Sequence, residues 1–137
     1  MTMKPYLFFS GRADEAIAFY QKALGAEVNF LLRFDESPEP PPPGALAPDW
    51  GAKIMHSCLR IGDSEIFLSD GCGTDAAHFE GFAVSLEAKN AAQAEGFYAA
   101  LLDGGEARMP LGETFFATSF GMAVDRFGVL WMIVVPK

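Results

Sequence analysis

Along this chain, hydrophobic residues occur in short strand-like runs and at helical spacing, and these two patterns follow one another in the same order in each half. In the first half, a short apolar run predicts a strand at residues 6–9, and apolar residues at helical spacing predict a helix over 13–24. β-forming residues then predict strands at 28–34, 53–61 and 65–69, with a Gly-Asp-Ser turn joining the last two. The first half is therefore predicted to form a βαβββ unit.

The second half repeats this order. A strand is predicted from Phe82 and a helix follows it, after which further strands are predicted at 106–111, 117–124 and 129–135. The Phe-Tyr dipeptide of the first helix returns in the second, and the Gly-Ala-Glu that follows the first helix returns as Gly-Gly-Glu. Internal self-similarity of this kind marks a repeated supersecondary unit.

We therefore predict an α+β fold in which two βαβββ modules, at about 1–71 and 80–137, share the single domain 1–137. The segment 35–51 holds six of the nine prolines, which lack the N–H that an inner strand needs, so a long loop is predicted there. This loop is either a passive connector, or a lid or arm between subunits. Trp50 is expected to anchor its end by packing on the module.

The ends of the two helices carry separate signals. Ser10 or Asp14 is expected to cap the start of the first helix, and Gly25 lies where a left-handed residue ends a helix. Asn90 and Gln93 have the spacing of a capping box at the start of the second helix. The buried side of that helix is either Ala94, Phe97 and Leu101 or Ala94, Tyr98 and Leu102.

Composition narrows the classes of partner. Half of the 137 residues are hydrophobic and thirteen are Phe, which is enough for a single core, while a net charge of −8 argues against nucleic acid or an anionic membrane surface as a partner. Two cysteines form no disulfide framework, and no apolar run has the length of a signal peptide or a membrane span. A cytoplasmic protein is expected.

The repeat resembles a known superfamily at several motifs. The helix sequence AIAFYQKALGAE, the run HSCLRIGDSEIFLSDG and the ending DRFGVLWMIVV together resemble the vicinal oxygen chelate superfamily of glyoxalase I, extradiol dioxygenases and bleomycin-resistance proteins. The proline-rich insertion, and ETFFATSFG before DRFG, are similar to its PhnB-like branch. The resemblance covers the whole chain. It implies curved mixed sheets around a cup, with homodimerisation.

The resemblance also implies where a metal would lie. Members that catalyse reactions hold one divalent cation with His, Gln or Glu side chains on the first and last strands of each module. Here Pro5, Phe67, Phe82 and Met132 occupy these positions, and Tyr6 is the one neighbour with any ligand character. Carbon side chains and a thioether bind hard or borderline divalent cations poorly, so we predict that there is no family metal centre and no cofactor.

A cup without metal would be lined by aromatic, Leu and Met side chains, which is typical of small-molecule sites but also of a plain hydrophobic core. A small-molecule ligand is expected to contact Phe9, Phe67, Ser69, Phe82, Phe116, Trp131 and Met132.

Three polar residues are candidates for acid–base chemistry: His56 in a strand, Asp70 at a strand end and Glu113 at the start of ETFF. Each also has a structural interpretation, as a hydrogen-bonded histidine within the sheet or as a solvated or turn-capping carboxylate. Cys58 is expected to be buried and inert.

The sequence IFLSDGCGT resembles the glycine-rich turn of methyltransferases, and PhnB-like domains are sometimes described as 3-demethylubiquinone methyltransferases. Asp75 occupies the third glycine position, however, and the stretch that follows is too short for the required helix. The predicted function is therefore a small-molecule binding protein of the bleomycin-resistance type. One alternative is a lyase or isomerase of the glyoxalase type that uses His56 and Glu113. A methyltransferase acting on a quinone precursor is a remote alternative.

Overall fold

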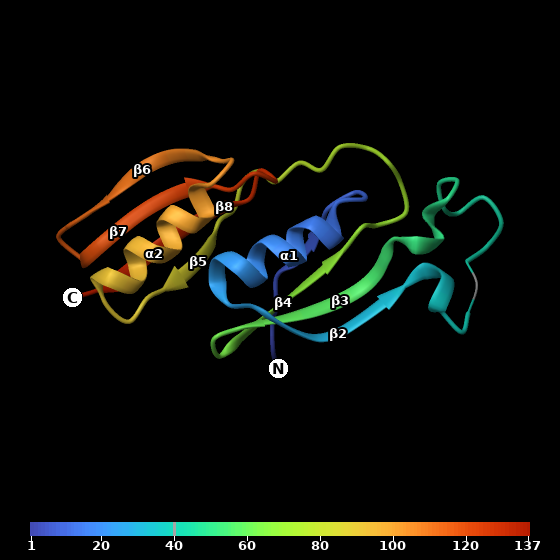
Figure 1. Cartoon of the computed structure of the whole chain (residues 1–137), viewed down its shortest axis with the longest axis horizontal. Coiled ribbons are helices and arrows are strands. Elements are labelled where there is room, and N and C mark those ends of the chain that lie inside the picture. Colours follow the sequence, from blue (N-terminus) through green and yellow to red (C-terminus); the bar gives the residue numbers. More distant parts are fainter. Residues whose placement is uncertain (40) are drawn as a thin grey trace. The chain divides into compact units, whose positions relative to one another are not determined.

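The computed structural model describes residues 1–39 and 41–137 and divides them into two compact units, Met1–Ala77 and His78–Lys137. Among the described residues, each unit contains one α-helix and one four-stranded sheet (Figure 1). Pro40, which belongs to the predicted loop, lies outside the described residues.

The first unit is a βαβββ module. It consists of β1 (Tyr6–Phe8), α1 (Ala13–Leu24), β2 (Glu27–Arg33), β3 (Ile54–Ile61) and β4 (Ser64–Ser69). The strand order is β1-β4-β3-β2, with β1 parallel to β4 and the other neighbours antiparallel. The predicted helix has the observed bounds, and the predicted strands differ from the observed ones by a residue or so at their ends.

The second unit repeats the topology. It consists of β5 (Val84–Glu87), α2 (Ala91–Leu102), β6 (Glu106–Gly112), β7 (Ala117–Val124) and β8 (Leu130–Pro136). The order β5-β8-β7-β6, with β5 parallel to β8, matches that of the first sheet strand for strand. The prediction of two βαβββ modules is confirmed.

In each unit the helix covers one face of the sheet, and the core lies between them (Figure 1). Because successive strand residues point to opposite faces, alternate residues are buried against the helix. In the first unit the core contains Leu7, Leu59, Ile66 and Leu68 from the strands and Ile17 and Tyr20 from α1. In α2 the buried residues are Ala94 and Leu101, which are members of the first of the two predicted stripes.

The start of α1 is capped differently from the prediction. Neither Ser10 nor Asp14 caps it; the N-cap position is Arg12, whose side chain makes no capping bond. Oδ1 of Asp70, which follows β4, instead accepts hydrogen bonds from the N–H groups of Gly11 and Ala13, each at 2.8 Å. A carboxylate that is distant in sequence thus satisfies the first orphan N–H of the helix, that of Ala13, together with the N–H of Gly11 just before it.

The predicted end of α1 at Gly25 and the predicted cap of α2 by Asn90 are confirmed, whereas the reciprocal bond of a capping box, from the Asn90 N–H to the Gln93 side chain, is replaced by one from the N–H of Lys89. Gly25 has φ 67° and ends α1 in the left-handed conformation. The side chain of Asn90 accepts the Gln93 N–H at 2.9 Å, while the Gln93 side chain reaches back to the N–H of Lys89 at 2.7 Å.

The predicted loop between β2 and β3 begins with the short 3-10 helix Phe34–Glu36 and ends with a second one, Trp50–Ala52. Trp50 is buried, and its Nε1–H donates to the carbonyl of Gly71 at 2.7 Å. The predicted anchoring role of this residue is confirmed. The choice between connector and lid stays open.

Candidate functional site

The face of the first sheet that lies away from α1 carries exposed aromatic side chains. Strand register places Tyr6 opposite Phe67, Phe67 opposite Cys58, and Cys58 opposite Phe30, so one row crosses all four strands. Tyr6 is 40% exposed and Phe30 49%, although large hydrophobic side chains are usually buried. Phe8, two residues after Tyr6, is 53% exposed.

The rings of this row and its neighbours form one cluster, which we call the aromatic face: Tyr6, Phe8, Phe30, His56 and Phe67. The centroids of Tyr6 and Phe8 are 4.9 Å apart in a stacked arrangement, and those of His56 and Phe67 are 5.0 Å apart. His56 also lies 5.6 Å from Tyr6 and 5.8 Å from Phe30. The imidazole therefore has aromatic rings as neighbours on several sides.

A single hydrogen bond joins the two polar groups of the aromatic face. The hydroxyl of Tyr6 and Nδ1 of His56 are 3.3 Å apart. Within the described part of the chain, every buried side-chain nitrogen or oxygen has a hydrogen-bond partner, whereas Nε2 of His56 has none. Because an unpartnered nitrogen is then not buried, Nε2 is accessible to a ligand or to water.

A polar cluster centred on Glu65 borders this face. The Glu65 carboxylate accepts hydrogen bonds from Nζ of Lys4 at 2.7 Å, from Nδ2 of Asn29 at 3.0 Å and from Sγ of Cys58 at 3.0 Å. These bonds, with Lys4 first, lower the pKa of Glu65 from 4.5 to about 2. The Lys4 ammonium also lies 5.2 Å from the centroid of Phe67.

Cys58 is buried, as predicted, and its side chain belongs to the open face rather than to the helix side. Its burial, followed by the hydrogen bond to Glu65, raises the pKa of the thiol. The thiol is thus held protonated, which suits a hydrogen-bond donor and disfavours a nucleophile.

The corresponding face of the second sheet has a different chemistry. Ser85 lies opposite Met132, Met132 opposite Met122, and Met122 opposite Met109. Thioethers therefore replace the aromatic row of the first unit. Methionine side chains are flexible and adapt to varied shapes.

The predicted ligand contacts divide between faces and cores. Phe67 and Met132 lie on the open faces of their sheets. Phe9 and Trp131 are 2% and 1% exposed, and they belong to the cores: the Phe9 ring packs near Tyr20, and the Trp131 Nε1–H donates to Asp125 at 2.9 Å. Neither can line an open face.

The remaining predicted contacts are Ser69, Phe82 and Phe116. Ser69 is buried opposite Phe8, and its Oγ accepts the N–H of Gly71 at 3.3 Å, as expected of a turn-stabilising residue. Phe82 and Phe116 are 43% and 45% exposed and lie outside the strands.

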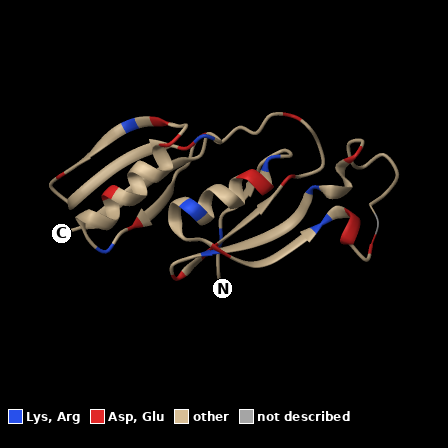
Figure 2. Cartoon of the chain, in the orientation of Figure 1, with Lys and Arg blue, Asp and Glu red and all other residues tan. Residues whose placement is uncertain are grey.

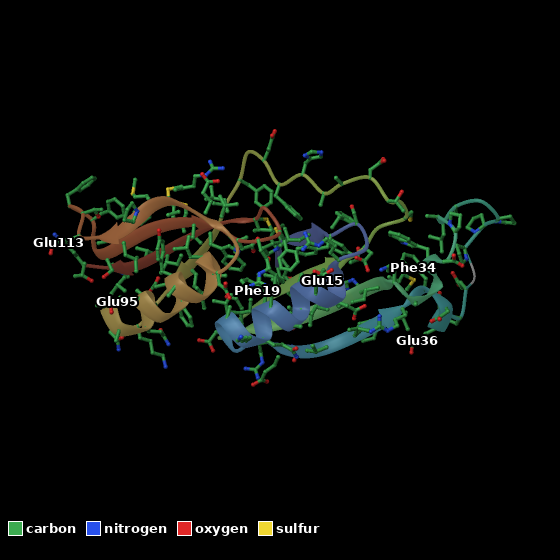
Figure 3. The ribbon with its side chains drawn as sticks, turned by 45° about the horizontal axis from the view of Figure 1, so that its top comes forward. Glu15, Phe19, Phe34, Glu36, Glu95 and Glu113 are labelled. Atoms are coloured by element: carbon green, nitrogen blue, oxygen red, sulfur yellow. The ribbon has the colours of Figure 1, made fainter. Side chains whose placement is uncertain are left out.

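The three acid–base candidates have different environments. His56 lies on the aromatic face, whereas Asp70 is 1% exposed, with Oδ1 bonded to two N–H groups at α1 and Oδ2 bonded to the Ile54 N–H at 2.9 Å. Asp70 therefore has a structural role. Glu113 points away from the ribbon between β6 and β7 (Figure 3) and lies 3.6 Å from Nζ of Lys137.

Comparison with known proteins assigns the chain. A sequence model of the family described as 3-demethylubiquinone-9 3-methyltransferase matches residues 1–134. The chain belongs to this family. A curated relative, Protein YjdN of Escherichia coli K12, is 37% identical over 100% of this chain and 97% of its own length.

One solved structure supports the same assignment, and a second one shares the fold. Protein PA1353 from Pseudomonas aeruginosa is 39% identical, with a TM-score of 0.85 over 99% of this chain and 98% of its own. A Bacillus cereus protein described as both PhnB protein and 3-demethylubiquinone-9 3-methyltransferase has a TM-score of 0.79 at 21% identity, covering 98% and 99% of the two chains.

The glyoxalase-like fold is confirmed by a more distant structure. A glyoxylase/bleomycin resistance protein/dioxygenase domain from Frankia sp. EAN1pec superposes with a TM-score of 0.67 at 14% identity, covering 100% of this chain and 98% of its own. The fold expected from the resemblance to the vicinal oxygen chelate superfamily is therefore confirmed.

The metal positions of that superfamily do not fit a metal here. Register places Tyr6, rather than Pro5, beside Phe67 on the open face, and Ser85, rather than Phe82, beside Met132. These side chains supply at most hydroxyl and thioether groups, which are poor ligands for divalent cations. Among residues 1–39 and 41–137, no group of three or more His, Cys, Asp or Glu side chains has a metal-binding arrangement.

The family's descriptive name refers to methyl transfer, but the glycine-rich segment does not have the expected context. Gly71 and Gly73 lead into a stretch without helix or strand that continues to Val84, and both sheets are mixed rather than parallel. A nucleotide-type cofactor site needs a helix that begins directly after such a turn.

The basic side chains are dispersed over both units. Lys and Arg form short, separated segments on both units rather than a continuous stripe (Figure 2), as expected for a net charge of −8. In the described part of the chain, none of the helices has the length and hydropathy needed to cross a membrane.

Proposed function

We propose that this protein binds a small flat molecule on the aromatic face of its first module, in the manner of bleomycin-resistance proteins and without the metal centre of its superfamily. The observation that carries the proposal is the exposure of Tyr6, Phe8 and Phe30 around His56 and Phe67. Exposed rings of this kind lose water contact when a flat ligand stacks on them, and aromatic stacking adds to the gain.

The proposal is supported by the chemistry of the surrounding residues. Lys4 and Glu65 neutralise each other, and Arg60 pairs with Glu27 further along the same face. The face therefore offers no unpaired charge to a strongly ionic ligand, and an uncharged or weakly polar molecule suits it best.

The test is a titration of the protein with 2-methoxynaphthalene, an uncharged flat probe, followed by amide and side-chain NMR. We expect shifts at the aromatic face, and at least a tenfold loss of affinity in Phe67→Ala. Phe115→Ala is the matched control, because Phe115 is 91% exposed in the second unit. Equal binding by wild type and both variants would place the ligand elsewhere and refute the proposal.

The absence of the metal centre is tested separately. Protein purified without an affinity tag is expected to contain no stoichiometric zinc, nickel, iron or manganese. If such a metal is present and is lost when a neighbour of Tyr6, Phe67 or Met132 is changed, this part of the proposal is wrong.

We further propose that the protein acts as a cytoplasmic homodimer. The family resemblance supports dimerisation, and the exposed apolar residues Met109 and Phe116 provide surface that a second copy could cover. Light scattering at micromolar concentration is expected to give twice the mass of the chain, and a monomer under these conditions would contradict the proposal.

One enzymatic alternative keeps a specific observation in its favour. His56 has an accessible ring nitrogen on an aromatic surface, as a general base for a lyase or isomerase would require. Glu113, the other residue predicted for this enzymatic function, belongs to the second unit, where it pairs with Lys137. Methyl transfer to a quinone precursor rests on the family's name alone.

A further inference from the structure

The Tyr6–His56 hydrogen bond indicates which chemical groups a ligand needs. The two groups lie 3.3 Å apart on an otherwise apolar surface, and Nε2 of His56 is accessible. A neutral imidazole carries its proton on one of its two nitrogens, and the partner of one nitrogen decides what the other offers.

Both possible arrangements expose one donor and one acceptor. If Tyr6 donates to Nδ1, the proton of the ring is on Nε2, which then donates, while the phenolic oxygen can accept. If Nδ1 donates to Tyr6, Nε2 accepts and the phenolic proton is available for donation. A ligand hydroxyl is itself both donor and acceptor, so it matches the pair in either arrangement, whereas an ether or a carbonyl only accepts.

The neighbouring rings determine what carries this hydroxyl. Tyr6 stacks with Phe8 at 4.9 Å and with His56 at 5.6 Å, at interplanar angles of 29° and 28°. Tyr6 and Phe8 are 40% and 53% exposed, so these nearly parallel rings can stack with another flat ring, and a hydroxyl at its edge would then approach Tyr6 or His56.

The nearby charges favour a neutral form of the ligand. The Glu65 carboxylate already accepts three hydrogen bonds, and the Lys4 ammonium is bonded to it at 2.7 Å. Neither group is therefore available to neutralise a buried charge on the ligand, which would be costly to desolvate.

We propose that the Tyr6–His56 pair is a specificity-determining site for a neutral flat conjugated ring that bears a hydroxyl group, such as a phenol or an enol. This inference rests on the proposed function, because it assumes that a flat molecule binds to the aromatic face. It adds the chemical class of the ligand and names the two residues that select it.

The experiment compares 2-naphthol with its methyl ether, 2-methoxynaphthalene, at neutral pH by isothermal titration and NMR. One neutral hydrogen bond corresponds to about a three- to tenfold difference in affinity, so 2-naphthol should bind the wild type tighter by about that factor. His56→Phe keeps a ring but removes the nitrogens. In this variant the ether should still bind, and 2-naphthol should bind with about the same affinity as the ether.

Tyr6→Phe is the second variant, because it removes only a hydroxyl and leaves the stacked ring in place. It should also lower the preference for 2-naphthol without weakening the ether. His78→Phe is the matched control, since His78 lies in the loop before β5, and it should keep the wild-type ratio.

The outcomes separate the two proposals. If both probes shift the resonances of the aromatic face but bind equally well, or if His56→Phe and Tyr6→Phe both retain the wild-type preference, the hydroxyl selection is wrong while the binding function stands. If neither probe affects the aromatic face of the wild type, the proposed function fails and this inference fails with it.

Discussion

Replacement of Asp70 by Asn should destabilise the first module far more than its small chemical change suggests. The side chain is 1% exposed, and its carboxylate accepts three backbone N–H groups, those of Gly11, Ala13 and Ile54, at 2.8 to 2.9 Å. These bonds connect the end of β4 to the β1–α1 turn and to the start of β3. They therefore set the positions of the strands that carry Tyr6 and His56.

The magnitude follows from the hydrogen bonds that Asn cannot make. In the better orientation of the Asn side chain, its amide oxygen still accepts the N–H groups of Gly11 and Ala13. Its NH2 group then faces the N–H of Ile54, so that hydrogen bond to a charged acceptor, worth about 1.5–3 kcal/mol, is lost. The two remaining bonds lose charge assistance, about 1 kcal/mol each. Release of a buried charge offsets part of this cost, and the expected net loss is about 2–4 kcal/mol.

The assay is urea unfolding followed by NMR, which reports the two units separately. With a urea dependence near 2 kcal/mol per molar, the midpoint of the first unit should fall by about 1–2 M. Asp14→Asn is the control, because Asp14 is 54% exposed and pairs with Arg33 at 2.8 Å, an exposed contact worth less than about 1 kcal/mol. A midpoint for Asp70→Asn equal to that of the control would refute the reasoning.

Three further outcomes are expected. Gly96→Ala in α2 should stabilise the second unit by roughly 0.5–1 kcal/mol in urea unfolding, because a Cβ there meets no atom within 4 Å; a lower midpoint would contradict this. Gly105→Ala should destabilise it by about 3 kcal/mol or more, since the Cβ would lie 2.0 Å from the Val124 carbonyl oxygen, and an unchanged midpoint would refute this. The folded-state pKa of Glu65, about 2, is below its ordinary 4.5, so its stabilising contribution is full above about pH 4.5 and is lost as pH falls toward 2. Glu65→Gln should remove that part of the pH dependence measured by unfolding, and a variant with the wild-type pH profile would count against it.

The sequence predicts nearly all of this fold because two strong local signals repeat. Helical spacing and Gly25 fix the bounds of α1, and the Asn90–Gln93 pair fixes the start of α2. These signals depend only on near neighbours in sequence, so no knowledge of the tertiary structure is needed to use them. Trp50 is similar: a lone large aromatic at the end of a polar, proline-rich loop indicates an anchor.

The candidate site is predicted less completely because it depends on which face each strand residue occupies. Phe9 and Phe67 have the same side chain, yet one is in the core and the other on the aromatic face. The difference comes from strand register, which a composition-based assignment cannot resolve. The Tyr6–His56 bond requires β1, β4 and β3 to be adjacent, and β1 joins β4 across most of the module's sequence.

The cap of α1 likewise depends on a contact between residues that are distant in sequence. Ser10 and Asp14 have the residue types that cap helices, and they lie at suitable positions. Asp70 provides the cap because the β4 strand ends beside the start of the helix, where a buried carboxylate can also bond the β3 backbone. A local pattern therefore cannot identify a cap that serves three segments at once.

The two modules share a topology but differ where a ligand could bind, and the reason is energetic. Residues that face a helix are constrained by packing, and in both units they are the usual Leu, Ile, Val, Ala and aromatic core residues. Residues on the open faces are partly exposed, so substitutions there change stability little. The first sheet has a row with three aromatic residues, Tyr6, Phe67 and Phe30, and the second has a row of methionines at matching positions of the repeated topology. Binding specificity in this fold can therefore change on the open faces while the scaffold of each module stays the same.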